Sequence, residues 1–405
     1  NFIATIIWKK RVSPANDSKW YSSDHEYICI YAKMRDLWHP NKTQRTENHN
    51  QYYKNPDNDQ RGPWNSAAYT CNKSRSERRN LYYAITNPFT KEEIWPDENA
   101  VWAYSPETHA LHVKDNLLYW GADGTSKSPR KKQFLTDAKP VVPRSIWDYQ
   151  EVGSTQTATT ESRNLFNGAS FSYPKSVGLM KKAIYQGTQA NDIILDIFSG
   201  SATTAHAVMQ LNAEDGGNRK FIMVQLPEAC DEKSEAFKAG YKTIAEIGKE
   251  RIRRAGKKIK EENPLTTQNL DIGFRVFKVD TSNMKDVYYT PDDLKQDNLE
   301  LFKDHIKPDR RPEDLLFQVF LDWGLDLTLP IAKESIDGKT VFLVDTNALL
   351  ACFDSGITEE LIKKLAKYKP LRAVFRDDAF GSDSVKINVE QIFKLLSPTT
   401  EVKSI

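Results

Sequence analysis

The sequence predicts a mixed α/β protein with more than one domain. Apolar runs of strand length, such as FIATIIW (residues 2–8) and RKFIMVQL (219–226), recur along the chain, and helical segments such as ATTAHAVMQL (202–211) lie between several of them. Strands that alternate with helices are typical of a parallel α/β sheet. With 405 residues, the chain is long enough for two or three domains, each with its own core.

The first 152 residues divide into a strand pair and an irregular segment. FIATIIW and EYICIYAK (26–33) are predicted strands joined by a polar connection, so we expect residues 1–35 to form a strand pair of the main sheet. In residues 36–152 the periodicity breaks down, and Pro, Asn, Asp and Gly separate short aromatic segments. We interpret this part as an irregular inserted module.

In residues 153–281 predicted helices and strands alternate again. This part begins with a Ser/Thr-rich stretch, GSTQTATTES (153–162), which reads as a linker. The elements predicted after it are, in order, a helix marked by Val177, Met180 and Ile184, a strand in NDIILDIFSG (191–200), the helix at 202–211, the strand at 219–226, a long charged helix at 234–260 and a strand at 271–280.

Residues 282–405 are predicted to form a C-terminal α/β unit. Its elements are a helix at 312–324, a strand at 340–346, a helix at 358–368, a strand at 372–377 and a helix at 389–396. The first of these helices carries an apolar stripe made of Leu315, Leu316, Val319, Phe320 and Trp323. Such a stripe fits a partner-protein contact or the core of the unit itself.

Composition excludes several classes of protein. A chain with 39% hydrophobic and 28% charged residues is typical of soluble domains, and no run reaches the ~18 apolar residues of a membrane span. Its four cysteines lie far apart without a CxxC pair, so neither a disulfide framework nor a metal site is predicted, and a cytoplasmic location fits best. Because the first residue is Asn1 rather than methionine, we expect the chain to start part-way through a longer product.

The net charge of +2 conceals a gradient along the chain. Residues 1–150 carry 22 Lys+Arg against 17 Asp+Glu, whereas residues 261–405 carry 19 against 26. Eight of the nine tryptophans also lie in the first 150 residues. A basic, aromatic-rich N-terminal part is typical of a protein that binds a polyanion, since cations neutralise phosphates and aromatic rings stack on bases. A solvated surface over a Trp-rich core is the alternative on charge alone.

The loop after Asp196 is the most informative candidate site. In an α/β sheet, ligands bind at the carboxyl ends of strands, and Asp196 ends a predicted strand. Gly200 permits a tight turn, its small neighbours leave room for a ligand, and Thr203 begins a helix whose positive end favours a carboxylate. The loop has one glycine where a G-x-G-x-x-G fingerprint needs three, which disfavours a nicotinamide dinucleotide.

At this loop the sequence resembles a known family. FSYPKSVGLMKKAI followed by DIILDIFSGSATTAHAVMQLNAEDGGNRKFIMVQLPE is similar to the cofactor half of the modification subunit of type III restriction-modification systems. The resemblance also takes in NFIATIIWKK, SSDHEYICIYAK and EIGKERIRRAGKKI. It implies a β-class adenine-N6 DNA methyltransferase, with a Rossmann-like S-adenosylmethionine-dependent sheet, an inserted target-recognition module (36–152) and a cofactor part (153–281). The implied reaction is site-specific methyl transfer from S-adenosylmethionine to adenine in double-stranded DNA.

The resemblance implies a set of cofactor residues. The family's D-x-F-x-G-S-G loop falls on positions 196 to 202, with Ala202 in place of the last glycine, which would add a methyl group beside the cofactor. The family's Pro-Lys-Pro motif falls on positions 174 to 176, where Lys175 faces the methionine carboxylate or is simply a surface lysine at a helix start. Gln225 stands where many relatives have an acid for the ribose. The expected cofactor-binding residues are Lys175, Ser176, Asp196, Phe198, Ser199, Gly200, Ser201, Ala202, Thr203 and Gln225. His206 is expected to be a packed helix residue rather than a base.

The family's catalytic loop is missing from the sequence. An Asp-Pro-Pro-Tyr type loop holds the exocyclic amine of a flipped base in this family, and the chain contains no Pro-Pro dipeptide. We expect that loop upstream of Asn1, so that the sheet lacks strands and leaves apolar edges exposed. No catalytic residue is predicted in this chain, which alone should not methylate DNA. A non-catalytic DNA-binding or assembly protein is the alternative.

Partners follow from the same resemblance. The expected DNA-binding residues are Lys9, Lys10, Arg11, Arg61, Trp64, Arg130, Lys131 and Lys132. The C-terminal unit (282–405) is expected to pair two modification subunits as a homodimer or to bind the ATP-dependent restriction (helicase-nuclease) subunit. VFLVDTNALLACFD also superficially resembles the start of a PIN-type nuclease, with Asp345, Asp377 and Asp378 as metal ligands, but too few residues follow for that fold.

Overall fold

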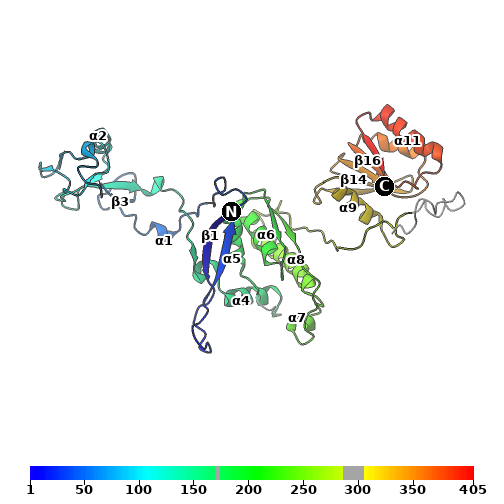
Figure 1. Ribbon diagram of the computed structural model, residues 1–405, viewed down its shortest axis with the longest axis horizontal. Coiled ribbons are helices and arrows are strands. Elements are labelled where there is room, and N and C mark those ends of the chain that lie inside the picture. Colours follow the sequence, from blue (N-terminus) through cyan, green and yellow to red (C-terminus); the bar gives the residue numbers. More distant parts are fainter. Residues whose placement is uncertain (169–173, 286–304) are drawn as a thin grey trace. The chain divides into compact units, whose positions relative to one another are not determined.

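The computed structural model describes residues 1–168, 174–285 and 305–405. Contacts between residues divide the chain into two units, Asn1–Gly273 and Phe274–Ile405, and each is a mixture of strands and helices (Figure 1). The mixed α/β class predicted from the sequence is confirmed. Residues 171–173, which open the FSYPK motif, lie outside the described residues. Among the helices of the described part, none is long and apolar enough to cross a membrane.

The first unit begins with a strand pair and a long irregular segment. Its elements up to residue 152 are β1 (Phe2–Lys9), β2 (His25–Tyr31), α1 (Glu47–Asn50), β3 (Trp64–Ala68), β4 (Thr70–Cys71), η1 (Arg79–Leu81), β5 (Ile85–Thr86), β6 (Glu93–Ile94), β7 (Val101–Trp102), α2 (Pro106–Lys114), β8 (Leu118–Tyr119), β9 (Arg130–Phe134), η2 (Leu135–Asp137), β10 (Ile146–Trp147) and α3 (Tyr149–Val152). The elements that follow are α4 (Thr155–Leu165), α5 (Val177–Gly187), β11 (Ile193–Asp196), α6 (Thr203–Asp215), β12 (Lys220–Met223), α7 (Glu235–Lys238) and α8 (Ile244–Glu262).

A three-stranded sheet of order β10-β1-β2 starts the unit. β1 and β2 are antiparallel and β10 is parallel to β1, so the chain returns to the first sheet after more than a hundred residues. Trp8 and Trp147 are neighbours in register and both are 1% exposed. They pack with Val152 and Leu179, which join this sheet to α3 and α5.

A second, two-stranded sheet carries the predicted loop. β11 and β12 are parallel and α6 connects them. Because successive strand residues point to opposite faces, Ile194 packs with α5 and α6 whereas Ile193 and Leu195 are 58% and 60% exposed. One face of this strand pair is therefore apolar and exposed.

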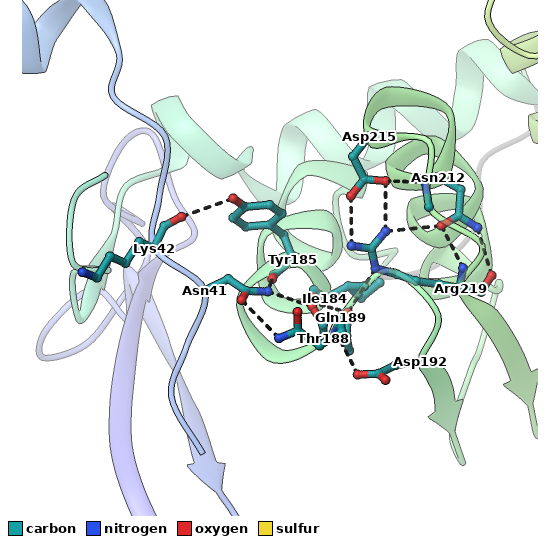
Figure 2. Close-up of polar contacts among 11 residues, drawn as sticks. Asn41, Lys42, Ile184, Tyr185, Thr188, Gln189, Asp192, Asn212, Asp215 and Arg219 are labelled. Atoms are coloured by element: carbon teal, nitrogen blue, oxygen red, sulfur yellow. Dashed lines mark hydrogen bonds and ion pairs between the residues drawn. The ribbon is translucent and has the colours of Figure 1, made fainter. Parts of the chain in front are cut away.

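The β2–β10 segment, residues 32–145, contains small sheets of two or three strands. Thr43 and Val141 form an antiparallel bridge where the chain enters and leaves this segment. Asn41 ties the entry to the end of α5, because its side-chain amide donates to the carbonyl oxygens of Tyr185 (2.7 Å) and Thr188 (2.8 Å), as Figure 2 shows. These bonds satisfy carbonyl groups that the last turn of a helix leaves without partners.

Three sequence predictions in this unit differ from the structure. The predicted linker at 153–162 is largely α4, which begins because Ser154 accepts a hydrogen bond from the backbone of Thr157 and so caps the helix. The long helix at 234–260 is divided into α7 and α8, since Gly240 takes a left-handed φ of 95° that ends the first of them. Residues 271–280 have no strand partner among the described residues.

The second unit is a five-stranded sheet between two helical layers. Its elements are α9 (Pro312–Asp322), β13 (Ile331–Ile336), β14 (Lys339–Val344), β15 (Leu349–Cys352), α10 (Glu359–Ala366), β16 (Arg372–Phe375), α11 (Asp383–Leu396) and β17 (Glu401–Ser404), and the sheet order follows the sequence from β13 to β17. Alternate residues of β14, β15 and β16 pack against α10 and α11 on one face and against α9 on the other. The α9 stripe, including Leu316 and Phe320, is therefore part of the core of this unit.

Candidate functional site

The loop between β11 and α6 is held by hydrogen bonds to its own ends and to β12. Asp196 accepts hydrogen bonds from the backbone of Phe198 (3.1 Å) and from the hydroxyl of Thr204. The backbone N–H of Gly200 donates to the side-chain oxygen of Gln225, just beyond β12, at 2.7 Å. These bonds bring the end of β11, the loop and Gln225 together.

Gly200 faces open space. Its φ of 51° lies in the left-handed region, which a glycine adopts without strain. A Cβ atom added there would meet nothing within 4 Å. The α6 helix starts directly after it, and its N-cap residue, Ala202, makes no side-chain cap. The loop that leads into the positive end of α6 therefore has open space in front of Gly200.

Ala202 differs from the expectation that its methyl group would lie beside the cofactor. The residue is 2% exposed and has a φ of 59°. Its methyl group points toward α8, where a Cβ placed on Gly248 would lie 3.4 Å from it. Gly248 thus leaves room for the extra methyl group on the inner side of the loop.

Lys175 and Ser176 have partners elsewhere in the first unit. The Lys175 ammonium lies 2.6 Å from a carboxylate oxygen of Glu26 in β2 and above the ring of Trp8. Burial alone would raise the pKa of Glu26, but the hydrogen bonds and charges of Lys175 and Lys10 outweigh it and lower that pKa. Ser176 is fully buried, caps α5 and donates to the Val152 carbonyl oxygen at 2.6 Å.

The predicted DNA-binding residues divide into buried and exposed groups. Lys132 is 2% exposed and its ammonium is paired with Asp57 and Asp59, and Trp64 is 4% exposed. The other predicted cations reach solvent to different degrees, and each of the following contacts a neighbour: Lys9 pairs with Asp148, Lys10 with Glu26 and Arg61 with Asp59, while Arg130 donates to Ser66 and Lys131 lies over the Tyr104 ring. Arg11 is exposed at the start of the β1–β2 connection.

Sequence reasoning missed Arg251, which lies against the loop. It is 0% exposed on the inner face of α8, and a guanidinium nitrogen donates to the Ser201 hydroxyl at 3.1 Å. The sequence pattern could have predicted its burial, because Arg251 lies at the same four-residue spacing as the buried residues Ile247, Ala255 and Ile259. A cation inside an apolar stripe is unusual enough to be singled out.

His206 is a packed residue of the α6 helix, as expected. Its Nδ1 atom is buried without a hydrogen-bond partner among the described residues. Burial, with the nearby charges of Arg251 and Lys258, lowers the pKa of His206 to about 3, so the folded chain keeps this imidazole neutral.

The burial of His206 predicts an acid-sensitive stability. In the unfolded chain the imidazole takes up a proton below about pH 6.5, whereas the folded chain does not until near pH 3, so stability is full above pH 6.5 and is lost as the pH falls. Because part of the residue reaches solvent, we expect a contribution of about 1 kcal/mol to the loss between pH 7 and pH 5. Urea unfolding of the wild type and of His206→Leu at both pH values measures it. Equal losses in the two proteins would show that His206 does not titrate in this range.

Asp377 and Asp378, two of the acids considered as metal ligands, have cations as partners in the described part of the second unit. Asp378 is paired with Arg376, while Asp377 is paired with Lys386 and accepts a bond from Ser404. In the described ranges no three His, Cys, Asp or Glu side chains gather at metal-ligand spacing. These pairings give no support to metal binding by Asp377 and Asp378.

Comparison with known proteins places the loop in a family. The DNA methylase family of the N6 and N4 type matches residues 1–238, which include β1, the loop and β12. The chain belongs to this DNA methylase family. The family resemblance inferred from the loop motif is confirmed.

Several DNA methylases are similar over long stretches. The StyLTI Mod subunit of a type III restriction-modification enzyme from Salmonella typhimurium is 34% identical over 72% of this chain and 43% of its own length. The EcoPI Mod subunit of Escherichia phage P1 is 28% identical over 94% of this chain and 62% of its own length. The type II methyltransferase M.KpnI of Klebsiella pneumoniae is 26% identical over 61% of each chain. The chain thus spans about two fifths to three fifths of the relatives it matches.

Proposed function

We propose that this DNA methylase chain provides the cofactor-binding and DNA-recognition parts of a site-specific adenine-N6 DNA methyltransferase of a type III restriction-modification system. The observation that carries the proposal is the β11–α6 loop, where an open space faces Gly200 at the start of an uncapped helix. The similarity to type III Mod subunits supports the target and the system.

The loop fits S-adenosylmethionine, which supplies a methyl group on a positively charged sulfur. The uncapped N–H groups at the start of α6 suit the amino-acid carboxylate of the cofactor. The Gly200 backbone can approach the cofactor closely because no side chain fills the space in front of it. Gln225 orients Gly200 and stands at the position from which the ribose hydroxyls would be bound. Phe198, 83% exposed beside this space, offers a ring to the adenine.

Within this proposal, β11 and β12 belong to a Rossmann-like methyltransferase sheet together with β1, β2 and β10. Residues 36–152 form the inserted target-recognition module. The double-stranded DNA surface would use the exposed Arg61 and Arg130 and the half-buried Lys131 of this module, with Lys9, Lys10 and Arg11 at its entrance. Their phosphate contacts would weaken with salt. Lys132 and Trp64, which are buried, would support that surface from within. The second unit would mediate homodimer formation or bind an ATP-dependent restriction subunit.

Titration of the 405-residue chain with S-adenosylmethionine in a calorimeter tests the proposal. We expect saturable binding of one cofactor per chain, competition by S-adenosylhomocysteine and no competition by NAD. Since no Asp-Pro-Pro-Tyr type loop occurs in these 405 residues, radiolabelled methyl transfer to DNA is expected once that loop is supplied, and not before. A chain that binds DNA but not the cofactor would favour the alternative, a DNA-binding or assembly protein that retains the fold.

A further inference from the structure

The α8 helix supports the cofactor loop from its buried side. Gly248 and Arg251 are one turn apart on α8 and both are buried. A Cβ on Gly248 would lie 3.4 Å from the Gly200 carbonyl oxygen and 3.4 Å from the Ala202 methyl group. Arg251, one turn further on, donates to the Ser201 hydroxyl at 3.1 Å. Three consecutive loop residues are thus contacted from one helix face.

The burial of the Arg251 charge costs free energy. Arg251 is 0% exposed, and burial lowers its pKa to about 10, so it stays charged at neutral pH. Its Nε and one of its terminal nitrogens have no hydrogen-bond partner among the described residues. A buried charge without an ion-pair partner carries a desolvation cost that nothing offsets in full. Packing alone therefore does not explain why an arginine occupies this position in the stripe.

The charge of Glu161 offsets only part of the cost of burying the Arg251 charge. Glu161 on α4 attracts the guanidinium, but no ion pair between them is present in the described structure, and its carboxylate accepts the backbone N–H of Val177 at 2.9 Å. Burial raises the pKa of Glu161. The direct hydrogen bond of the guanidinium is thus the one to Ser201.

We propose that Arg251 is a positioning residue that fixes Ser201, and with it the backbone from Gly200 to Ala202, in the conformation that receives the cofactor. This inference rests on the proposed function and names a residue that deepens it. A hydroxyl that accepts a hydrogen bond from a cation becomes a better donor, so the Ser201 proton is polarised toward an oxygen of the ligand. The contact also removes a rotational freedom of the loop that binding would otherwise have to restrict.

The test compares Arg251→Met, Arg251→Lys, Ser201→Ala and the double variant Ser201→Ala/Arg251→Met in the full 405-residue chain. Lys257→Met is the matched control, because this lysine lies on the same helix with a side chain that is 77% exposed and pairs with Glu261. We expect Arg251→Met to weaken S-adenosylmethionine binding about tenfold, as loss of one charged hydrogen bond implies. Ser201→Ala should weaken it by a similar factor, and the double variant by no more than either single one.

A second readout needs no ligand. Amide hydrogen exchange of the unliganded chain should become faster in residues 198–205 of Arg251→Met and Ser201→Ala, and stay unchanged in Lys257→Met. If the wild type fails to bind the cofactor, the proposed function is wrong, and the exchange data still decide whether Arg251 holds the loop. Unchanged affinity in Arg251→Met, or a double variant whose loss is the product of the single losses, would overturn the inference. Should Arg251→Met unfold, Arg251→Lys decides, because it keeps the charge while its side chain is one atom shorter and draws the donor away from Ser201. Weaker cofactor binding by Arg251→Lys supports the inference, and wild-type affinity overturns it.

Discussion

Gly200→Asp is expected to weaken S-adenosylmethionine binding about a hundredfold or more. The added side chain would project into the open space in front of the loop, where a Cβ meets no other atom of the described protein. It would therefore occupy the volume proposed for the cofactor and place a negative charge beside the N–H groups that suit the cofactor's carboxylate. A hundredfold loss corresponds to about 2.7 kcal/mol, the scale of losing a favourable contact and gaining a repulsive one. Calorimetric titration measures it.

Gly216→Asp is the matched control for this variant. Gly216 ends α6, has a φ of 71°, and also faces open space. Aspartate tolerates this left-handed conformation in both places, so the backbone cost and the added charge are the same. The two sites are separated by the length of α6, about 20 Å at 1.5 Å per residue. Equal cofactor affinities for the two variants would show that the loop is not the binding site.

The loop was predictable because its chemistry is local. A strand that ends in Asp196, a glycine four residues later and a helix start determine where a ligand can approach, and these features follow one another along the chain. Gln225 was singled out by the family resemblance, and its place beside the loop agrees with the rule that residues following adjacent parallel strands lie at the same edge. The direction of the Ala202 methyl group was not, because it depends on Gly248 in a helix more than forty residues away.

The sequence pattern did not predict which polar residues would be buried. Lys132, Ser176 and Arg251 each belong to residue types that are mostly exposed, yet each is at most 2% exposed here. Their burial depends on partners distant in sequence, namely Asp59, Val152 and Ser201. A motif locates such residues but does not tell whether the side chain faces a ligand or the protein interior.

Arg219 connects three elements of the first unit near the C-terminal end of α6, the end opposite the loop. Its side chain is 3% exposed and its guanidinium is paired with Asp215 at the end of α6 (2.9 Å). It also donates to Asn212 and to the Thr188 hydroxyl that follows α5, as Figure 2 shows. Burial alone would raise the pKa of Asp215, but the Arg219 guanidinium outweighs it and lowers that pKa. The network therefore sets how α5, α6 and β12 meet.

Arg219→Met is expected to lower the free energy of unfolding of the first unit by about 2 to 3 kcal/mol, because methionine fills much of the volume but leaves the buried Asn212 and the Thr188 hydroxyl without the guanidinium. Lys181→Met is the control: Lys181 joins α5 to Glu214 of α6 by a pair that is 35% and 42% exposed, which implies a loss of less than about 1 kcal/mol. Urea unfolding followed by tryptophan fluorescence reports on the first unit, since eight of the nine tryptophans lie in residues 1–150. Similar small losses in both variants would mean that burial adds nothing to the Arg219 network. A loss confined to Arg219→Met would establish that the packing of α5 and α6, on which the loop geometry depends, is secured by a buried charge rather than by surface pairs.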